Sequence, residues 1–231
     1  MYLNAAAIVL SARRSGDKDK RLSLYTREFG RLFALAVGAA RPGAKLGAAT
    51  EPAVEARFRL WREGDALSTR VTGGGVENGF PRLRVRWDRM AAAHVLCEWT
   101  ERLTPPADPN PEKYDLLRRA LSLLETADVA AVRLSFMARF LSLAGYSPAR
   151  DVPGLASVPG AADFLAERAD DDLSEVPSLP SGIPAPYLGQ QLLKFVAPLL
   201  HTPLRSAAHE EDMKSFQLSA ISSQLKPTAL V

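Results

Sequence analysis

The sequence has few of the residues that build disulfides, zinc sites and membrane spans. Cys97 is the one cysteine among 231 residues, which excludes an internal disulfide and a cysteine-rich zinc site. The chain has no apolar run long enough for a transmembrane helix. Its apolar start lacks a preceding basic segment and is followed at once by Arg13 and Arg14, so it predicts a first strand and not a signal peptide. We therefore expect a cytoplasmic protein that does not enter a membrane.

The motifs of common catalytic sites are also missing. The chain has no GxxxxGK phosphate loop, no GxSxG elbow, no HExxH metal site, and no GxGxxG between a predicted strand and helix. We identify no pair of carboxylates suited to acid–base chemistry. Gly73, Gly74 and Gly75 form a dense glycine cluster, but no Lys-Ser/Thr pair follows it, so we interpret it as a flexible exit from a barrel. The sequence therefore predicts a binding protein and not an enzyme.

Charge is distributed unevenly along the chain. Residues 1–86 contain 16 Lys+Arg and 8 Asp+Glu, a balance of +8, whereas residues 87–231 contain 13 and 18, a balance of −5. A basic block joined to a mildly acidic remainder is typical of proteins in which one part meets a polyanion.

The hydrophobic periodicity changes near the same boundary. Before residue 80 apolar residues alternate in short segments, which predicts five antiparallel strands at 5–11, 21–25, 31–37, 54–61 and 66–72. Five short strands suit a small closed barrel of the oligonucleotide/oligosaccharide-binding (OB) type. We expect an OB-fold nucleic-acid-binding domain over residues 1–80.

From residue 81 onward the apolar spacing is helical. This predicts an all-α domain over residues 81–231 and an α+β protein as a whole. The expected parts are a three-helix bundle at 82–147, a Pro/Gly-rich insert at 148–183 and terminal helices at 184–225. The first helix is expected from about residue 82 to 103.

Basic residues gather near the turns of the predicted barrel and on one of its strands. Arg57 and Arg59 share a strand face with Trp61. Cations along a groove neutralise phosphates, and an exposed aromatic ring stacks on bases, so together they favour single-strand binding. The predicted nucleic-acid site consists of Arg13, Arg14, Arg27, Arg31, Arg41, Lys45, Arg57, Arg59 and Trp61.

Several short motifs resemble the RecO family of bacterial recombination mediators. The string TREFGR at residues 26–31 is similar to the family's T-x-E-x-G-K/R hairpin, and GAAR at 38–41 resembles its basic loop. LSLAGYSP at 141–148 resembles the family's L-G-x-x-P helix end, and MKSF at 213–216 resembles its terminal K-S helix. The order of barrel, bundle and late helices also matches.

The resemblance implies a DNA-binding recombination mediator. Such a protein binds single- and double-stranded DNA, anneals complementary strands and helps load RecA onto DNA coated by single-strand-binding protein (SSB). RecR and the C-terminal tail of SSB are the implied partners, with RecA as an indirect one, in a nucleoid-associated cytoplasmic protein. An acidic, apolar-ended tail would suit a hydrophobic groove rimmed by the arginines of the second and third helices, which are Arg118, Arg119, Arg133 and Arg139.

Two features depart from the family pattern. Many members have a four-cysteine zinc module after the G-x-x-P element, and residues 149–165 contain no cysteine, so we predict neither zinc nor another cofactor. The basic loop is also diluted, because Val37 and Ala40 stand where the family often has Lys and Arg.

Two other functions suit the same residues. A basic OB-fold barrel could bind structured RNA, and competition between RNA and DNA of equal length would separate these functions. The basic surface could instead contact an acidic protein, making the chain a non-enzymatic interaction scaffold with little affinity for nucleic acid at moderate salt.

Overall fold

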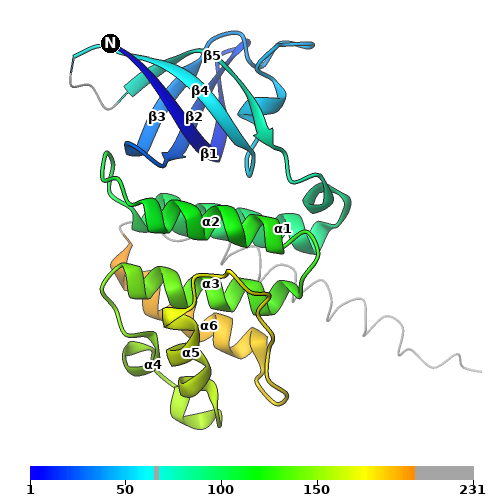
Figure 1. Ribbon diagram of the computed structural model, residues 1–231, viewed down its shortest axis with the longest axis vertical. Coiled ribbons are helices and arrows are strands. Elements are labelled where there is room, and N and C mark those ends of the chain that lie inside the picture. The colour runs from blue at the N-terminus through cyan, green and yellow to red at the C-terminus, as the bar shows by residue number, and fades with distance from the viewer. Residues whose placement is uncertain (65–67, 201–231) are drawn as a thin grey trace, which may run out of the picture.

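A β-barrel stands on layers of helices in the computed structural model, which describes residues 1–64 and 68–200 (Figure 1). The layer next to the barrel contains α1 (Trp87–Leu103) and α2 (Pro111–Leu123). Beyond it lie α3 (Val129–Leu143), α4 (Pro148–Asp151), α5 (Ala161–Asp170) and α6 (Ala185–Val196). The predicted α+β class, with an N-terminal five-stranded barrel before the helices, is confirmed.

The barrel closes through one long first strand. Its members are β1 (Tyr2–Ser15), β2 (Asp19–Thr26), β3 (Gly30–Ala36), β4 (Glu55–Arg62) and β5 (Ser68–Asn78), in the order β1-β2-β3-β5-β4. The first half of β1 pairs with β4 and its second half with β2, with an irregularity between Val9 and Ser11 where the register shifts. Closure satisfies the backbone groups that an open sheet would expose at its edges.

The pairing differs from the prediction at one seam. We expected antiparallel strands throughout, but β3 and β5 are parallel. After β3 the chain passes to the edge of β1 that is not paired with β2, and it forms β4 there. Strand β5 then runs in the same direction as β3. Parallel neighbours need such a crossover, here the residues from 37 to 67.

The glycine cluster lies inside β5, so the expectation of a flexible exit was wrong. Gly74 pairs with Phe58 of β4. A Cβ at Gly74 would lie 2.6 Å from the Arg57 carbonyl oxygen and 2.9 Å from the Phe58 ring. Glycine here lets the two strands approach more closely than any side chain would allow.

The strand residues that alternate in the sequence also alternate in the structure. In β4, Ala56, Phe58 and Leu60 are buried while Arg57, Arg59 and Trp61 are exposed. The inward residues belong to a barrel core of their own, together with leucines of β1, β2 and β3. The hydrophobic effect therefore determines which strand face points outward.

The first helix begins later than expected. Residues Pro81–Val85 form a 3₁₀ turn, η2, whose Leu83 is fully buried, and the backbone is extended at Arg86 before α1 starts at Trp87. The next two helices begin at residues whose side chains cap them: Asn110 accepts from the Lys113 N–H and Asp128 from the Ala131 N–H. Such caps satisfy N–H groups that have no partner within the helix.

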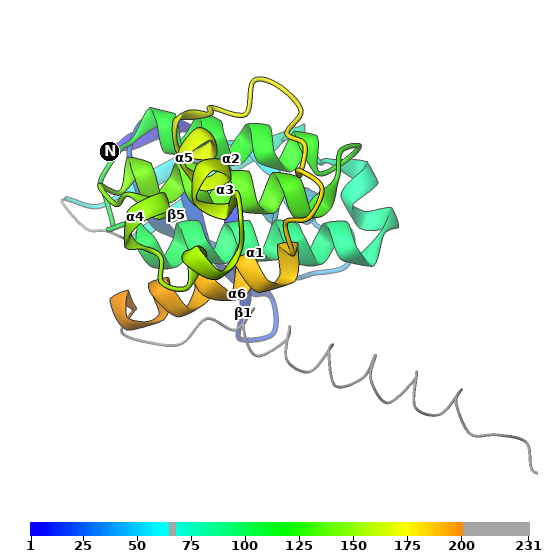
Figure 2. The ribbon, with the colours of Figure 1, turned by 90° about the horizontal axis from the view of Figure 1, so that it is seen from below.

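The helices pack around large apolar side chains. Trp99, Phe136 and Phe140 are fully buried in a core that also includes Ile8 and Tyr25 of the barrel. Figure 2 shows α1, α2 and α3 running side by side. Because barrel residues belong to the helical core, the two parts pack as one body.

The Pro/Gly-rich segment contains a helix that the sequence did not predict. Helix α5 buries Phe164 and Leu165, and it packs on α3. Two short 3₁₀ turns, η3 (Leu155–Ser157) and η4 (Ala197–Leu199), lie before α5 and after α6. The part of the predicted terminal helices from residue 201 onward, and the K-S motif at 213–216, lie outside the described residues. Within the described ranges no helix is long and apolar enough to span a bilayer.

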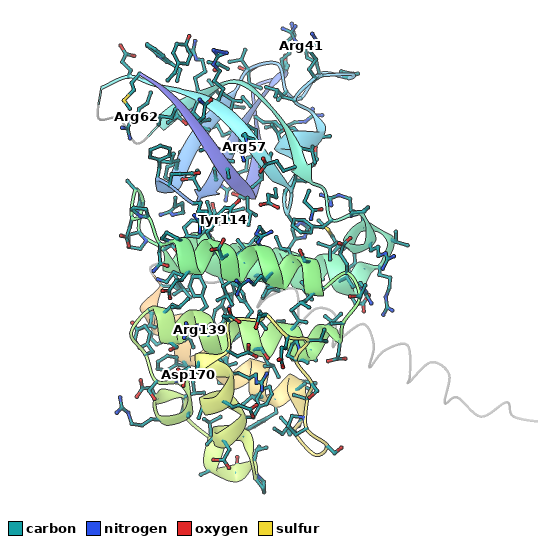
Figure 3. The ribbon with its side chains drawn as sticks, in the orientation of Figure 1. Arg41, Arg57, Arg62, Tyr114, Arg139 and Asp170 are labelled. Carbon is teal, nitrogen blue, oxygen red and sulfur yellow. The ribbon has the colours of Figure 1, made fainter. Side chains whose placement is uncertain are left out.

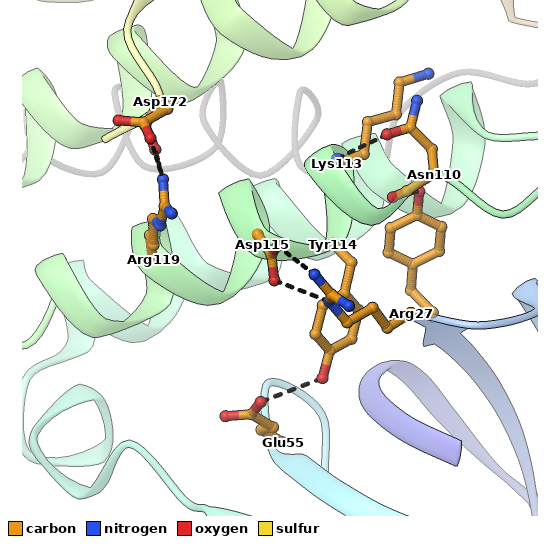
Figure 4. Close-up of polar contacts among 9 residues, drawn as sticks. Arg27, Glu55, Asn110, Lys113, Tyr114, Asp115, Arg119 and Asp172 are labelled. Atoms are coloured by element: carbon orange, nitrogen blue, oxygen red, sulfur yellow. Dashed lines mark hydrogen bonds and ion pairs between the residues drawn. The ribbon is translucent and has the colours of Figure 1, made fainter. Parts of the chain in front are cut away.

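Polar contacts hold the barrel on α2 (Figure 4). The Arg27 guanidinium pairs with Asp115, with 3.1 Å between Nη2 and Oδ2. The Tyr114 hydroxyl donates to Glu55 Oε1 at 3.2 Å, and the Tyr25 hydroxyl donates to the Asn110 carbonyl at 3.3 Å. These bonds fix the orientation of the barrel on the helices.

The Glu55 carboxyl at this junction should make stability depend on pH. Burial raises its pKa above the ordinary 4.5, against a smaller lowering by the hydrogen bond from Tyr114. The folded protein therefore keeps a proton that the unfolded chain loses, so this contribution to stability is present below pH 4.5 and is lost as pH rises through the folded pKa.

The substitution Glu55→Gln removes that titration and keeps an acceptor for Tyr114. We expect the free energy of unfolding of the variant to rise relative to the parent as pH increases from about 4.5 to 7.5. Urea unfolding at several pH values measures this difference. Parallel pH profiles for the two proteins would contradict it.

Candidate nucleic-acid interface

The structure places two of the predicted site residues at the junction with the helices. Arg27 pairs with Asp115, and Arg31 Nε donates to the Thr104 carbonyl at 2.9 Å. Burial lowers the pKa of Arg31, and the charge of Glu101 opposes this. The strand that contains Arg31 also forms a bridge to Pro106. Both arginines hold the barrel in place, so we leave them out of the interface.

The two predicted arginines on β4, Arg57 and Arg59, have different neighbours. Arg57, on the barrel wall in Figure 3, pairs with Glu77 of β5 at 2.7 Å, so a nearby carboxylate compensates its charge. Arg59 lies over the Tyr2 ring at 5.3 Å, and that ring meets Trp61 edge-on at 4.8 Å. Tyr2 and Trp61 are 60% and 40% exposed. Tyr2, Arg59 and Trp61 form a surface group, here called the aromatic cluster.

The loop between β3 and β4 forms a pocket with the end of β1. Its volume is about 470 Å³, and we call it the basic pocket. Lys20, one of its cations, pairs with Glu51 at 2.7 Å. Its lining is Ala12, Arg13, Arg14, Lys20, Ala39, Ala40, Arg41, Gly47, Glu51 and Pro52.

The loop is held in shape by local hydrogen bonds. Asp19 Oδ1 accepts from the Gly38 N–H at 2.8 Å, and the Thr50 hydroxyl donates toward the Leu46 and Gly47 carbonyls. Arg41 projects at the end of the barrel remote from the helices (Figure 3). It also lines a second pocket, of about 380 Å³, which includes Lys45. The predicted loop cations therefore lie together.

The strand register brings further residues to the outer face of the barrel. Each residue in this row stands opposite the next across neighbouring strands, and opposed residues point to the same side of a sheet. We call the row the barrel belt: Arg13 opposite Arg21, Arg21 opposite Leu35, Leu35 opposite Arg70, Arg70 opposite Trp61, and Trp61 opposite Tyr2.

The prediction of the site missed three exposed cationic or aromatic members of the belt, in addition to Leu35. Tyr2, Arg21 and Arg70 are exposed but were not among the predicted site residues. Arg21 alternates with the buried Leu22 in β2, which marks it as outward-facing. Its alignment with Arg70 depends on the β3–β5 seam, and a single sequence carries no signal for that long-range pairing.

Most cations of the belt, the basic pocket and the adjoining loop have no carboxylate partner among the described residues, whereas Lys20 of the pocket pairs with Glu51. In the helical layers some cations are paired, for example Arg119 with Asp172 and Arg168 with Asp171. Uncompensated charges on one surface give a positive potential that attracts polyanions. On this side of the barrel, the cations without an ion pair to another described residue include Arg13, Arg14, Arg21, Arg41, Lys45, Arg59 and Arg70.

Comparison with known families agrees with the arrangement of barrel and helices. Residues 1–77 match the family model "Recombination protein O N terminal", and residues 84–152 match "Recombination protein O C terminal". The chain belongs to the RecO family. The family that the short motifs suggested is thereby confirmed.

Relatives named "DNA repair protein RecO" match different shares of the chain. The protein from Pelotomaculum thermopropionicum is 40% identical over 144 residues, which cover 62% of this chain and 56% of the relative. That from Desulfitobacterium hafniense is 30% identical over 145 residues, 63% of this chain and 52% of the relative. The one from Rubrobacter xylanophilus is 32% identical over 213 residues, 87% and 82% of the two chains. The first two matches thus span just over half of the relative.

The four arginines that the RecO resemblance suggested for partner binding do not share one environment. Arg118 is exposed, while the other three are half-buried. Arg119 pairs with Asp172, and Arg139 donates to the Ala169 carbonyl at 2.9 Å. Arg133 lies against Gly189 of α6, where a Cβ would come within 2.9 Å of its Nη2. Three of the four therefore contact the chain that follows α3.

Because many RecO-family members have a zinc module, the metal-ligating side chains of this chain are of interest. No three His, Cys, Asp or Glu side chains come together as a metal site within the described ranges. Cys97 is fully buried in α1, and its burial raises the pKa of the thiol to about 12. A thiol in this environment stays protonated and unreactive at neutral pH.

Proposed function

We propose that this RecO-family protein is a DNA-binding mediator of DNA repair and recombination, whose barrel belt and basic pocket bind the DNA. The observation that carries the proposal is the gathering of unpaired cations and exposed aromatic rings on the barrel. Arg13 belongs to both the belt and the pocket, so the two form one continuous surface.

The chemistry of this surface suits a single strand. Guanidinium groups of Arg13, Arg21 and Arg70 would neutralise successive phosphates, and their release of counterions supplies affinity without sequence preference. The rings of Tyr2 and Trp61 offer faces for base stacking, which any base can use. Double-stranded DNA offers the same phosphates but keeps its bases stacked internally, so we expect weaker binding to the duplex.

Annealing of complementary strands follows from the same chemistry. The reaction makes and breaks no covalent bond, so catalytic groups are not required. Strands repel each other through their phosphates, and cations that bind these phosphates reduce the repulsion while leaving base edges free to pair. We therefore propose strand annealing as the activity of this surface, carried out without a zinc ion or other cofactor.

Partners are proposed on family membership. We propose that the protein acts with RecR, binds the SSB tail through its helical part and helps RecA load onto SSB-coated DNA. Arg118 is the exposed cation of the predicted partner set and is our first candidate for that contact. Arg119, Arg133 and Arg139 would support this surface from within, through their contacts with the chain after α3.

A salt series tests the DNA proposal. We expect the protein to bind a fluorescent oligo(dT), with the logarithm of the association constant falling linearly as the logarithm of salt concentration rises. A slope of about −3 to −5 corresponds to roughly four to seven phosphate contacts on a single strand. Binding that is absent or insensitive to salt would contradict the proposal. Preference for RNA of equal length would favour the RNA-binding alternative.

A further inference from the structure

The segment that links barrel and helices exposes unusual side chains. We call residues 79–87 the connector; it contains η2 and ends at the first residue of α1. Val85 is 82% exposed and Trp87 is 62% exposed, the former being the most exposed large apolar side chain of the described residues. Large apolar residues exposed close together mark interaction surfaces more often than isolated ones do.

Despite these exposed side chains, the connector is anchored at several points. The Arg84 guanidinium donates to the Gly79 carbonyl and, at 3.0 Å, to the Pro52 carbonyl. The Arg82 N–H donates to Glu125 Oε1 at 2.9 Å, and Leu83 is fully buried. Phe80, also fully buried, adopts a left-handed backbone conformation with φ of 43°. The exposed groups are therefore presented from a fixed backbone.

The connector is basic as well as apolar. Residues 79–89 contain four arginines and one acid, Asp88, which pairs with Arg86. Arg84 is bound by carbonyl oxygens, which leave its positive charge uncompensated. The Arg82 guanidinium has no carboxylate partner within the ranges that the structure describes. An occupant of this surface should therefore be anionic and carry flat apolar groups.

The connector adjoins the basic pocket. Pro52, whose carbonyl accepts from Arg84, is one of the residues that line that pocket. Figure 1 shows the connector between the end of β5 and the start of α1, beside the lower edge of the barrel. A chain that leaves the pocket over Pro52 would reach the connector next, at Arg84.

We propose that the connector is a second contact for the same single strand, with phosphates bound by Arg82 and Arg84 and one base stacked on Trp87. The inference rests on the proposed function, and it extends the DNA path beyond the barrel. Bases and phosphates alternate along a single strand. In residues 84–87 of the connector, arginine likewise alternates with the apolar Val85 and Trp87. An acidic protein segment would match the charge but would not require a stacking ring.

Tryptophan fluorescence can follow this contact directly. The chain has three tryptophans, and Trp99 is fully buried, so in a Trp61→Phe variant Trp87 is the exposed one. We expect oligo(dT) of about 30 nucleotides to quench Trp87, whereas about 6 nucleotides would fill the barrel site without reaching it. Quenching by poly-glutamate but not by the long oligonucleotide would assign the surface to an acidic protein and overturn the inference.

Affinity measurements provide the second test. The double variant Arg82→Glu/Trp87→Ala should bind the 30-nucleotide strand about tenfold or more weakly, the effect of one lost stacked base, and the short strand nearly normally. Its matched control is Arg150→Glu/Val176→Ala, which makes the same charge change and also removes an exposed apolar side chain, but away from the barrel.

The outcomes separate this inference from the proposed function. If the parent protein binds the long strand and the double variant binds it equally well, the connector contact is wrong and the barrel site stands. If the parent protein binds neither strand, both proposals fail. Equal weakening in the matched control would show a general charge effect and would also overturn the connector contact.

Discussion

Replacing Arg21 and Arg70 by glutamate should weaken binding to a single-stranded oligonucleotide at least about 100-fold at low salt. These residues stand on either side of Leu35 in the barrel belt, so a strand that crosses the belt passes both. Each substitution removes a cation and places a carboxylate beside the phosphates. Both side chains are exposed and neither is ion-paired within the described ranges, so folding should be unaffected.

A charge-matched variant controls for net charge. Arg150→Glu/Lys194→Glu makes the same change of charge at exposed positions of the helical part, and we expect it to bind within about twofold of the parent protein. The belt variant should also have a salt slope shallower by about 1.4, since each phosphate contact on a single strand contributes about 0.7. Equal losses in the two variants would contradict the belt as the DNA site.

Gly30→Ala should destabilise the protein far more than an alanine at another left-handed glycine. Gly30 has φ of +67°, and a Cβ there would lie 2.3 Å from the Asp108 carbonyl oxygen and 2.7 Å from its nitrogen. These are backbone atoms of the segment before α2. This segment cannot move away from Gly30 without pulling α2 from the barrel. We expect a loss of about 3 kcal/mol or more in the free energy of unfolding.

Gly16→Ala supplies the matched control. Gly16 has nearly the same φ, +66°, but nothing lies within 4 Å of a Cβ built there. Its substitution by alanine should lower the free energy of unfolding by about 1 kcal/mol, because alanine is strained in a left-handed conformation. Urea unfolding of the two variants measures the difference, which isolates the contact between barrel and helices. Similar losses in both would mean that the contact with Asp108 is not rigid.

The RecO hairpin motif gains a structural explanation from these contacts. Thr26 accepts from the Phe29 N–H and donates to the Gly30 carbonyl, which closes the turn. Arg27 and Arg31 then reach α2 and the Thr104 carbonyl. In this chain the motif therefore docks the barrel onto the helices, and the resemblance alone could not distinguish that role from DNA binding.

Local sequence was enough to predict much of the fold. Alternation in β4 correctly separated the buried Phe58 from the exposed Arg59, because period 2 follows from the geometry of any strand. Helical spacing likewise placed Trp99 and Phe136 in the core. It did not predict α5, because its few apolar residues lie in a Pro/Gly-rich stretch and become buried only against α3.

The sequence by itself determined the fold class, the family and the basic character of the barrel. Only the tertiary structure decided which cations share a surface. Alternation says which way a side chain points from its own strand, but not which strand lies beside it. The β3–β5 closure aligns Arg21 with Arg70, and the docking of the helices holds Arg27 at α2 and Arg31 at the end of α1, away from the proposed interface. Both depend on contacts between residues far apart in the chain, whose energies no local pattern contains.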